Sequence, residues 1–456
     1  MGQSSFRSRQ NSWISSISTL CLCMWMTNAN HSLLQADSPP ATTSLPTIDE
    51  ENKTLPNKSS ENFIKPGASN PVDILAQDSN AFSFELLKKA AGSVENVVFA
   101  PYSIFSCLSM VYAGAKGKTA DQIRQVLSLH GNAIEIAHAS FSLRNSLITS
   151  SREGCGLRFS SSNGLFADQD TFILSSFREL VQKNYQAEIA ALNFKETDKS
   201  LMTINGWVSN ETKGKIPQLL YSGDVNPSTR LILVNAAYFQ GKWFQPFDPK
   251  ATQQEPFHIT DERDIQVPMM HLTDTFSYFE NDLAQILSLP FQTCDLQDPH
   301  INCLLVLPKS ATDLQPLEQQ FTPALFRDWA NKMEPTKVNV QIPRFCMKKR
   351  FDLNSLLTQM GMTDAFNDKA DFSGINGMHD LFLSKMIHEA YFSLNEYGVE
   401  AAAATSAIIN AKAVQETKPP VLFAADHPFY FFLMDRQTQT ILFAGKIFQP
   451  DTSTCP

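Results

Sequence analysis

The segment from Glu396 to Lys412, EYGVEAAAATSAIINAK, combines a basic residue that a protease could recognise with a pattern that could enter a β-sheet. Glu400 is its only charged residue between Gly398 and Lys412, and it sets the phase of an alternating strand pattern. With Glu400 pointing outward, the opposite face carries small or uncharged side chains: Val399, Ala401, Ala403, Thr405, Ala407 and Ile409. This face could pass between two strands without burying a charge, and Gly398 supplies a flexible start. A helix is the alternative, because alanine is the best helix former.

Side chains for catalysis by the chain itself do not occur in a recognised arrangement. The sequence has no G-x-S-x-G, H-E-x-x-H or P-loop pattern. His388 could act as a base, but no nucleophile in a suitable turn precedes it. The cysteines form no CxxC pair and have no metal-ligand spacing. We therefore expect no enzyme activity, no cofactor and no metal site.

Two apolar motifs follow this segment. Residues 425–434 read ADHPFYFFLM, and residues 441–447 read ILFAGKI. Together with the hinge at Gly398 and the alanine run, they resemble the reactive-loop hinge and the C-terminal signature of the serpins, a family of serine protease inhibitors. The resemblance extends from about Val72 to the C-terminus. It implies a mixed α/β (α+β) fold, in which helices pack on large mixed and antiparallel β-sheets and a reactive-centre loop is exposed.

The resemblance also assigns roles to individual residues. It places Trp243 where the loop enters the central sheet, and Asn235 lower in the same strand, beside Ser103. It gives His388 a structural role, hydrogen-bonded with Asn235 and Ser103 where two strands must part. It makes the following residues the hinge: Glu396, Gly398, Val399, Glu400, Ala401, Ala402, Ala403, Ala404 and Thr405.

The activity implied by the resemblance is suicide inhibition of a serine protease. The protease would cut the loop and form a covalent acyl complex, and the freed segment Glu396–Lys412 would enter the central sheet. About sixteen inserted residues at ~3.3 Å each would carry the protease on the order of 50 Å. In inhibitory serpins the cut follows the residue fourteen positions after the hinge glycine, which here is Lys412, followed by Ala413. A basic residue before the cut predicts a trypsin-like protease.

The position of the cut has alternatives. The segment before His427 is a few residues longer than in many serpins, so Asn410 or Ile409 could precede the cut instead. Lys418 is the other basic residue nearby, but Pro419 follows it and would block most proteases.

Two residues depart from the pattern of inhibitory serpins. Val399 stands where Thr or Ser usually follows the hinge glycine, and Ala100 stands where a serine usually lies beneath the central sheet. Valine is uncharged and β-branched, so we expect Val399 to insert. A non-inhibitory serpin that acts as a binding or chaperone-like protein is the alternative function.

The composition is ordinary for a globular protein, with 43% hydrophobic and 18% charged residues in a chain of 456. The net charge of −9 argues against a general nucleic-acid binder. No run of eighteen or more apolar residues occurs, so we expect no membrane span. The expected partner is the target serine protease, bound by a monomer.

The first 71 residues divide into two predicted parts. Residues 1–29 are predicted to be a signal peptide, because Arg7 and Arg9 precede a moderately apolar stretch and small residues end it. Residues 30–71 are rich in Pro, Ser, Thr and Asn and predict a disordered linker. Residues 72–456 are then the serpin domain. The signal peptide predicts a secreted, extracellular protein, and without it the chain would be cytoplasmic.

The remaining elements are predicted from apolar patterning and local motifs. Cys107, Cys303 and Cys346 lie in apolar or strand-like segments, and we interpret them as buried free thiols rather than parts of a disulfide framework. A capping box at 119–122 predicts the start of a helix there. Helices are predicted over 80–91, 101–112, 119–127, 201–220 and 351–360, and strands over 97–100, 231–243, 286–290, 303–308, 338–345 and 383–394.

Overall fold

Two β-sheets organise the computed structural model, which describes residues 70–90, 92, 94–149, 157–293, 299–399 and 419–451. Within these residues one sheet has six strands in the order β10-β11-β12-β4-β2-β3, and β11 also pairs with β4. Its strands are β2 (Leu157–Asp168), β3 (Glu188–Leu192), β4 (Leu231–Lys242), β10 (Phe345–Asp352), β11 (Leu383–Asn395) and β12 (Gly398–Val399).

The second sheet has nine strands in the described part of the chain. Its order is β1-β15-β14-β8-β7-β6-β9-β13, and β5 pairs with β6. The strands are β1 (Val97–Phe99), β5 (Gln253–Thr260), β6 (Arg263–Glu280), β7 (Ala284–Pro290), β8 (Ile301–Pro308), β9 (Glu334–Pro343), β13 (Val421–Ala424), β14 (Phe429–Asp435) and β15 (Thr440–Ile447). Both sheets mix parallel and antiparallel pairs, since β4 runs parallel to β11 and β13 runs parallel to β9.

Helices pack on these sheets, as the sequence predicts. They are α1 (Pro71–Ala90), α2 (Pro101–Tyr112), α3 (Gly117–Val126), α4 (Ala133–Thr149), α5 (Ser175–Tyr185), α6 (Thr197–Glu211), α7 (Leu314–Gln320), α8 (Pro323–Lys332), α9 (Leu353–Met360) and α10 (Ser373–Asn376). Short 3-10 turns occupy Pro249–Ala251, Ala311–Asp313 and Asp364–Phe366. Among the described helices, none has the length and apolar character needed to cross a membrane.

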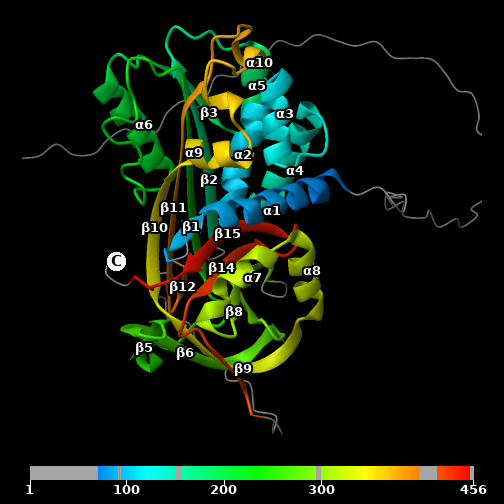
Figure 1. The fold of residues 1–456 in the computed structure, drawn as a ribbon, viewed down its shortest axis with the longest axis vertical. Coiled ribbons are helices and arrows are strands. Elements are labelled where there is room, and N and C mark those ends of the chain that lie inside the picture. The colour runs from blue at the N-terminus through cyan, green and yellow to red at the C-terminus, as the bar shows by residue number, and fades with distance from the viewer. Residues whose placement is uncertain are drawn as a thin grey trace, which may run out of the picture. The chain divides into compact units, whose positions relative to one another are not determined.

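The six-stranded sheet is covered on both faces, and this explains the largely apolar sequence of β4. Figure 1 shows α6 on one side of the sheet and α2 on the other. All residues of α2 are buried, and the helix packs against β4, β2 and β15 within the main core. A smaller core beneath α6 includes Val208 from the helix and Val234 from β4. A strand buried on both faces reads as a continuous hydrophobic run rather than as an alternating one.

Most of the predicted elements are confirmed, with three differences. The first helix begins nine residues earlier than predicted, at Pro71. The capping box is wrong: α3 begins at Gly117, and the Thr119 hydroxyl instead accepts a hydrogen bond from the Asp371 amide at 2.9 Å. The helix predicted to end at Leu220 ends at Glu211.

The early end of α6 has a local cause. The Asn205 side-chain oxygen accepts hydrogen bonds from the amides of Leu219 and Leu220, at 2.9 and 2.8 Å, and its nitrogen donates to the Leu220 carbonyl at 2.8 Å. These bonds satisfy the backbone groups of Leu219 and Leu220 outside a helix and hold this part of the chain against α6.

The cysteines differ in state. Cys107 and Cys303 are buried free thiols, as predicted, and burial raises the pKa of both. Cys346 is disulfide-bonded, so the prediction of a free thiol is wrong at this position. Its partner is not one of the cysteines that the structure describes.

Candidate functional site

The parallel strands β4 and β11 part at one end of the six-stranded sheet. They pair directly from Leu231 with Leu383 to Tyr238 with Tyr391. Beyond Tyr391, β12 lies between them and runs antiparallel to both. The chain therefore reverses direction after β11 and begins a new strand, β12, which lies between β11 and β4.

The residues of β12, Gly398 and Val399, are the third and fourth of the predicted inserting segment Glu396–Lys412. Val399 pairs with Leu394 of β11 and with Gly241 of β4, and Gly398 forms the pair before it. Val399 is 0% exposed and belongs to the main hydrophobic core. In place of the usual Thr or Ser, this chain thus has an apolar side chain that is already buried beneath the sheet.

Gly398 is held where no side chain fits. Its φ of +140° lies in a region that residues with a Cβ rarely adopt. A Cβ built on Gly398 would lie 2.0 Å from the Gly241 carbonyl oxygen. The close approach of the two backbones therefore requires glycine at this position.

Trp243, directly after β4, holds the turn between β11 and β12. Its indole Nε1–H donates to the Asn395 carbonyl at 2.9 Å, and its backbone N–H donates to the Tyr397 carbonyl at 2.9 Å. The ring is 3% exposed and stacks on Phe291, with the ring centroids 4.4 Å apart. Trp243 thus ties the end of β4 to the turn from which β12 begins.

Glu396 lies in this turn and not in β12. Its residue surface is 5% exposed, and its carboxylate accepts a hydrogen bond from the Thr252 hydroxyl at 2.9 Å. The Arg344 guanidinium lies 3.7 Å from the same oxygen, and the Glu396 carbonyl accepts from the Phe247 amide at 2.9 Å. These contacts anchor the turn from which β12 departs.

A buried polar network joins β4 and β11 where they still pair directly. His388 and Asn235 are cross-strand neighbours, and His388 Nδ1 lies 2.6 Å from Asn235 Oδ1. The Asn235 amide nitrogen donates to Ser103 Oγ of α2 at 2.7 Å and to Asn163 Oδ1 of β2 at 2.7 Å. Ser103, Asn235 and His388 are each 0% exposed. Separation of β4 from β11 at this level requires the His388–Asn235 bond to break.

The protonation of His388 follows from its partners. The Ala100 amide donates to Nε2 at 3.1 Å, so Nε2 is an acceptor and the proton resides on Nδ1, which donates to Asn235. Burial lowers the pKa of His388 to about 3, against the weaker opposing effect of the Asn235 hydrogen bond. The imidazole is therefore neutral near pH 7 and holds the two strands by hydrogen bonding rather than by charge.

The sequence did not reveal every member of this network. Ala100 lacks the hydroxyl usual in serpins, but its backbone amide supplies the bond to His388. Ser161 Oγ lies 2.7 Å from Ser103 Oγ, and Asn163 accepts from Asn235. The only signal for these β2 residues is a polar run, Ser160–Asn163, within a strand whose end is buried.

Several predicted site residues lie outside the described residues. These are the remaining hinge positions, Glu400 to Thr405, and the predicted reactive bond, Lys412 and Ala413. Their assignments stay predictions. The described residues bring together the start of the hinge, Trp243 and the network around His388 along the line between β4 and β11.

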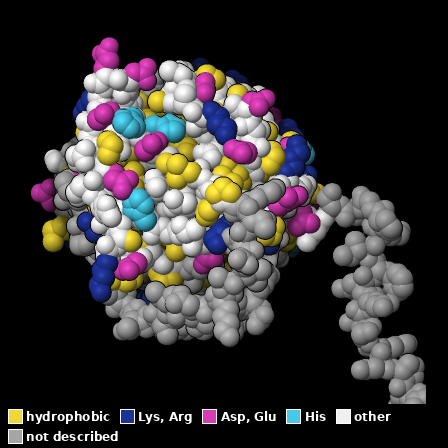
Figure 2. Space-filling view, turned by 90° about the horizontal axis from the view of Figure 1, so that it is seen from below, with side chains coloured by type: hydrophobic (Ala, Val, Ile, Leu, Met, Phe, Trp, Pro, Cys, Tyr) yellow, Lys and Arg dark blue, Asp and Glu magenta, His cyan; other side chains and the backbone are white. Residues whose placement is uncertain are grey.

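Several histidines elsewhere pair with carboxylates. His258 Nδ1 lies 2.8 Å from Asp264, and His271 Nε2 lies 2.7 Å from Glu255. Figure 2 shows histidine and acidic side chains next to one another on one face of the molecule. In the part of the chain that the structure describes, no group of three or more His, Cys, Asp or Glu side chains could hold a metal ion.

Comparisons with known proteins agree with this geometry. The family model described as "Serpin (serine protease inhibitor)" matches residues 77–450. This chain belongs to the serpin family. Serpin B6 of Macaca fascicularis is 40% identical over 389 residues, which cover 83% of this chain and 100% of that protein. Leukocyte elastase inhibitor of Bos taurus is 38% identical over 367 residues, covering 78% of this chain and 93% of the relative.

A solved serpin structure has the same fold. Mouse protein-Z dependent protease inhibitor superposes with a TM-score of 0.73 at 28% identity, covering 83% of this chain and 98% of that one. The family to which the chain belongs is described as one of serine protease inhibitors. The match to the family begins after the predicted signal peptide and linker, and several relatives are serpins of the B group, so the comparisons do not support the prediction of secretion.

Proposed function

We propose that this serpin inhibits a trypsin-like serine protease as a suicide substrate, with Lys412–Ala413 as the reactive bond. The observation that carries the proposal is the position of β12, since Gly398 and Val399 already lie between β4 and β11. The start of the inserting strand is therefore in place before any cleavage. Cleavage of the loop would free the rest of the segment to continue in the same direction.

The register of β12 indicates how far the segment would insert. If β12 continued beyond Val399 in the same register, Ile409 would lie opposite Leu231, the first residue of β4. Asn410 would lie opposite Leu383, the first residue of β11. An uncut segment through residue 410 would thus fill the full length of both strands. A cut after Lys412 leaves this length intact with two residues to spare. A cut after Asn410 would also leave it intact, whereas a cut after Ile409 would leave the segment one residue short of Leu383.

The inserted state would gain both hydrogen bonds and burial. Residues on the same face as Val399 include Ala401 and Ala403, and a strand alternates its side chains. Insertion would replace the direct β4–β11 ladder by two ladders on either side of a central strand. With about 1 kcal/mol of net stabilisation for each hydrogen bond, about ten additional bonds would stabilise the cleaved form by on the order of 10 kcal/mol.

The reaction proposed is an interrupted proteolysis. The protease serine Oγ attacks the Lys412 carbonyl carbon, and its proton passes through the protease histidine to the Ala413 nitrogen as the peptide bond breaks. An ester between the protease serine and Lys412 remains. Insertion then carries the protease away from its starting place before water hydrolyses the ester, and no further reactant is needed.

Two alternatives concern the target and the outcome. An elastase-like protease would cut beside a small residue instead of Lys412, and one relative is named as an elastase inhibitor. A non-inhibitory serpin, acting as a binding or chaperone-like protein, would be cut without trapping the protease or would not be cut at all.

We further propose that the inhibitor is a monomer and that its predicted signal peptide directs it to secretion. A cytoplasmic location is the alternative.

Incubation with trypsin, chymotrypsin and elastase tests the proposal. We expect an adduct that survives SDS with trypsin, and a released peptide whose mass places its start at Ala413. Lys412→Ala should slow the attack by trypsin but still trap any enzyme that cuts. Ala401→Arg keeps the cleavage site but puts a charge on the inserting face, at a cost of several kcal/mol, so the protein should be cut and released. Trapping by Ala401→Arg at the parent's efficiency would contradict insertion in this register.

A further inference from the structure

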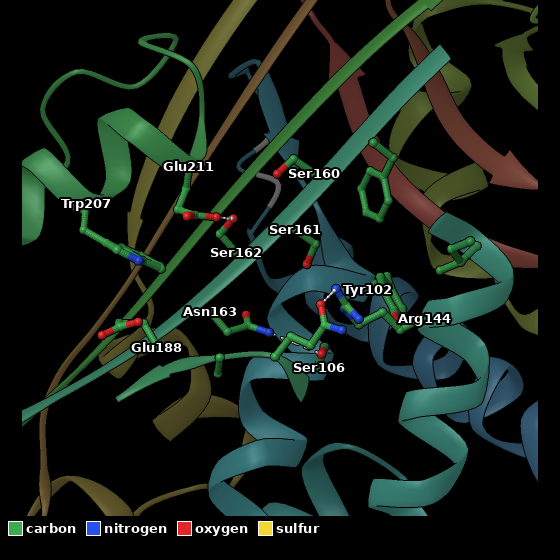
Figure 3. Close-up of a pocket in the computed structure, with 14 residues that line it drawn as sticks. Tyr102, Ser106, Arg144, Ser160, Ser161, Ser162, Asn163, Glu188, Trp207 and Glu211 are labelled. Atoms are coloured by element: carbon green, nitrogen blue, oxygen red, sulfur yellow. Dashed lines mark hydrogen bonds between the residues drawn. The ribbon is translucent and has the colours of Figure 1, made fainter. Parts of the chain in front are cut away.

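A cavity of about 260 Å³ lies at the open edge of β2. β3 pairs with β2 only from Gly164 onward, and the preceding residues Ser160–Asn163 have no neighbouring strand on that side in the described chain. Residues from α2, α4 and α6 also line the space. Figure 3 shows Arg144 and Tyr102 on one side of the cavity and Trp207, Glu188 and Glu211 on the other.

The side formed by α4 is cationic and incompletely paired. Arg144 Nη2 donates to the Gln186 side-chain oxygen, whereas Nη1 is buried without a hydrogen-bond partner. No carboxylate of the described residues forms an ion pair with Arg144. Burial lowers the pKa of Arg144, and Tyr102 partly opposes this effect. A carboxylate would satisfy the guanidinium, because the two groups match in charge and in hydrogen-bond geometry.

The opposite side is acidic and aromatic. Glu211, at the end of α6, accepts a hydrogen bond from Ser162 Oγ at 2.9 Å, which leaves its carboxylate facing the cavity. Glu188 begins β3, and Trp207 lies between α6 and the sheet. Two carboxylates and an indole face favour an ammonium group, by charge and by cation–π attraction.

We propose that this cavity binds a small zwitterion of the ω-amino acid class, with its carboxylate on Arg144 and its ammonium beside Glu188 and Glu211. A simple anion would leave the two carboxylates uncompensated, and a simple cation would leave the guanidinium unpaired. The volume lies just below the usual range for ligand pockets, so the ligand is small. The hydroxyls of Ser160 and Ser161 line the space between the two charged sides.

The cavity is also connected to the network that joins β4 and β11. Ser161 contacts Ser103, and Asn163 contacts both Asn235 and, at 3.3 Å, Ser106. Ser106, Ser161 and Asn163 line the cavity as well. A bound ligand would therefore join α4, β2 and α6, and should raise the thermal unfolding midpoint of the intact protein by mass action.

Calorimetric titration of the intact full-length chain tests the site, without any protease present. The probe is 6-aminohexanoate, and hexanoate and hexylamine are the comparisons that carry one charge each. We expect 6-aminohexanoate to bind about tenfold more tightly than either. Arg144→Gln and Glu211→Gln should each weaken it by about tenfold, because each removes one charged partner. Arg124→Gln, an exposed change of the same kind on α3, should leave the affinity unchanged.

Three results would overturn the proposal: no binding of 6-aminohexanoate, equal binding of hexanoate, or an unchanged affinity in Glu211→Gln. Glu211 is exposed, so its replacement should not affect folding, and this variant decides the question if Arg144→Gln proves unstable. The outcome is independent of protease inhibition, since neither the ligand nor the readout involves the loop.

Discussion

Acidification should destabilise this serpin through one buried side chain, His388. Burial lowers its pKa from 6.5 to about 3. Below pH 6.5 the unfolded chain binds a proton at this position, whereas the folded chain remains neutral until the pH approaches 3. Stability is therefore lost as the pH falls from about 6.5 towards about 3, and it is fully present above that window.

The size of the effect follows from the same shift. Each pH unit below 6.5 costs about 1.4 kcal/mol of unfolding free energy, so the loss at pH 5 relative to pH 7 is about 2 kcal/mol. His388→Gln should remove it, because an amide can donate to Asn235 and accept from Ala100 without titrating. Other groups that titrate in this range contribute equally to both proteins and cancel in the comparison.

Urea unfolding of the parent and His388→Gln at pH 7 and pH 5 measures the difference. His379→Gln is the control, because His379 is largely exposed, with 72% of its side chain accessible, and should leave the parent's pH dependence intact. If the parent and His388→Gln lost the same stability between the two pH values, His388 would not be the neutral buried partner of Asn235, and the account of the network would fail.

Two further predictions concern the backbone and the cysteines. Gly398→Ala should destabilise the intact protein by about 1–3 kcal/mol, because the added Cβ would clash with the Gly241 carbonyl and the backbone conformation disfavours a Cβ. Gly206→Ala is the control, because a Cβ at Gly206 meets nothing within 4 Å. Equal thermal unfolding midpoints for the two variants would refute the argument. Peptide mapping under non-reducing conditions should link Cys346 to Cys455, since the Cys346 amide donates to the Asp451 carbonyl at 2.8 Å, four residues before that cysteine. Linkage to any other cysteine would refute this assignment.

Much of the fold was predictable from the sequence because local patterns and tertiary packing agree there. Pro101 opens an apolar helix in a region where apolar residues occur on every side, and the run over β4 is hydrophobic on both faces. The alternation set by Glu400 predicted which face would be buried, and Val399 lies on that face. These signals depend on residues close together in the chain.

The features that the sequence missed depend on contacts between distant segments. Thr119 matches a capping box, but its hydroxyl accepts a hydrogen bond from the backbone amide of Asp371, which is distant in sequence. The backbone amide of Ala100 donates to His388 and completes its network. Residue types do not indicate which backbone amide will act as such a donor. The cavity beside Arg144 arises because β3 begins at Glu188 and leaves part of β2 open, which residue types alone do not specify.

The central claim is that the loop segment inserts between β4 and β11 once it is cut. Comparing the thermal unfolding of intact protein with that of protein nicked in the loop tests this most directly. Insertion should add hydrogen bonds on both sides of a new central strand and stabilise the nicked form by on the order of 10 kcal/mol, so its unfolding midpoint should rise well above that of the intact protein. An unchanged or lower midpoint in the nicked protein would show that the segment stays outside the sheet and would contradict the proposed mechanism.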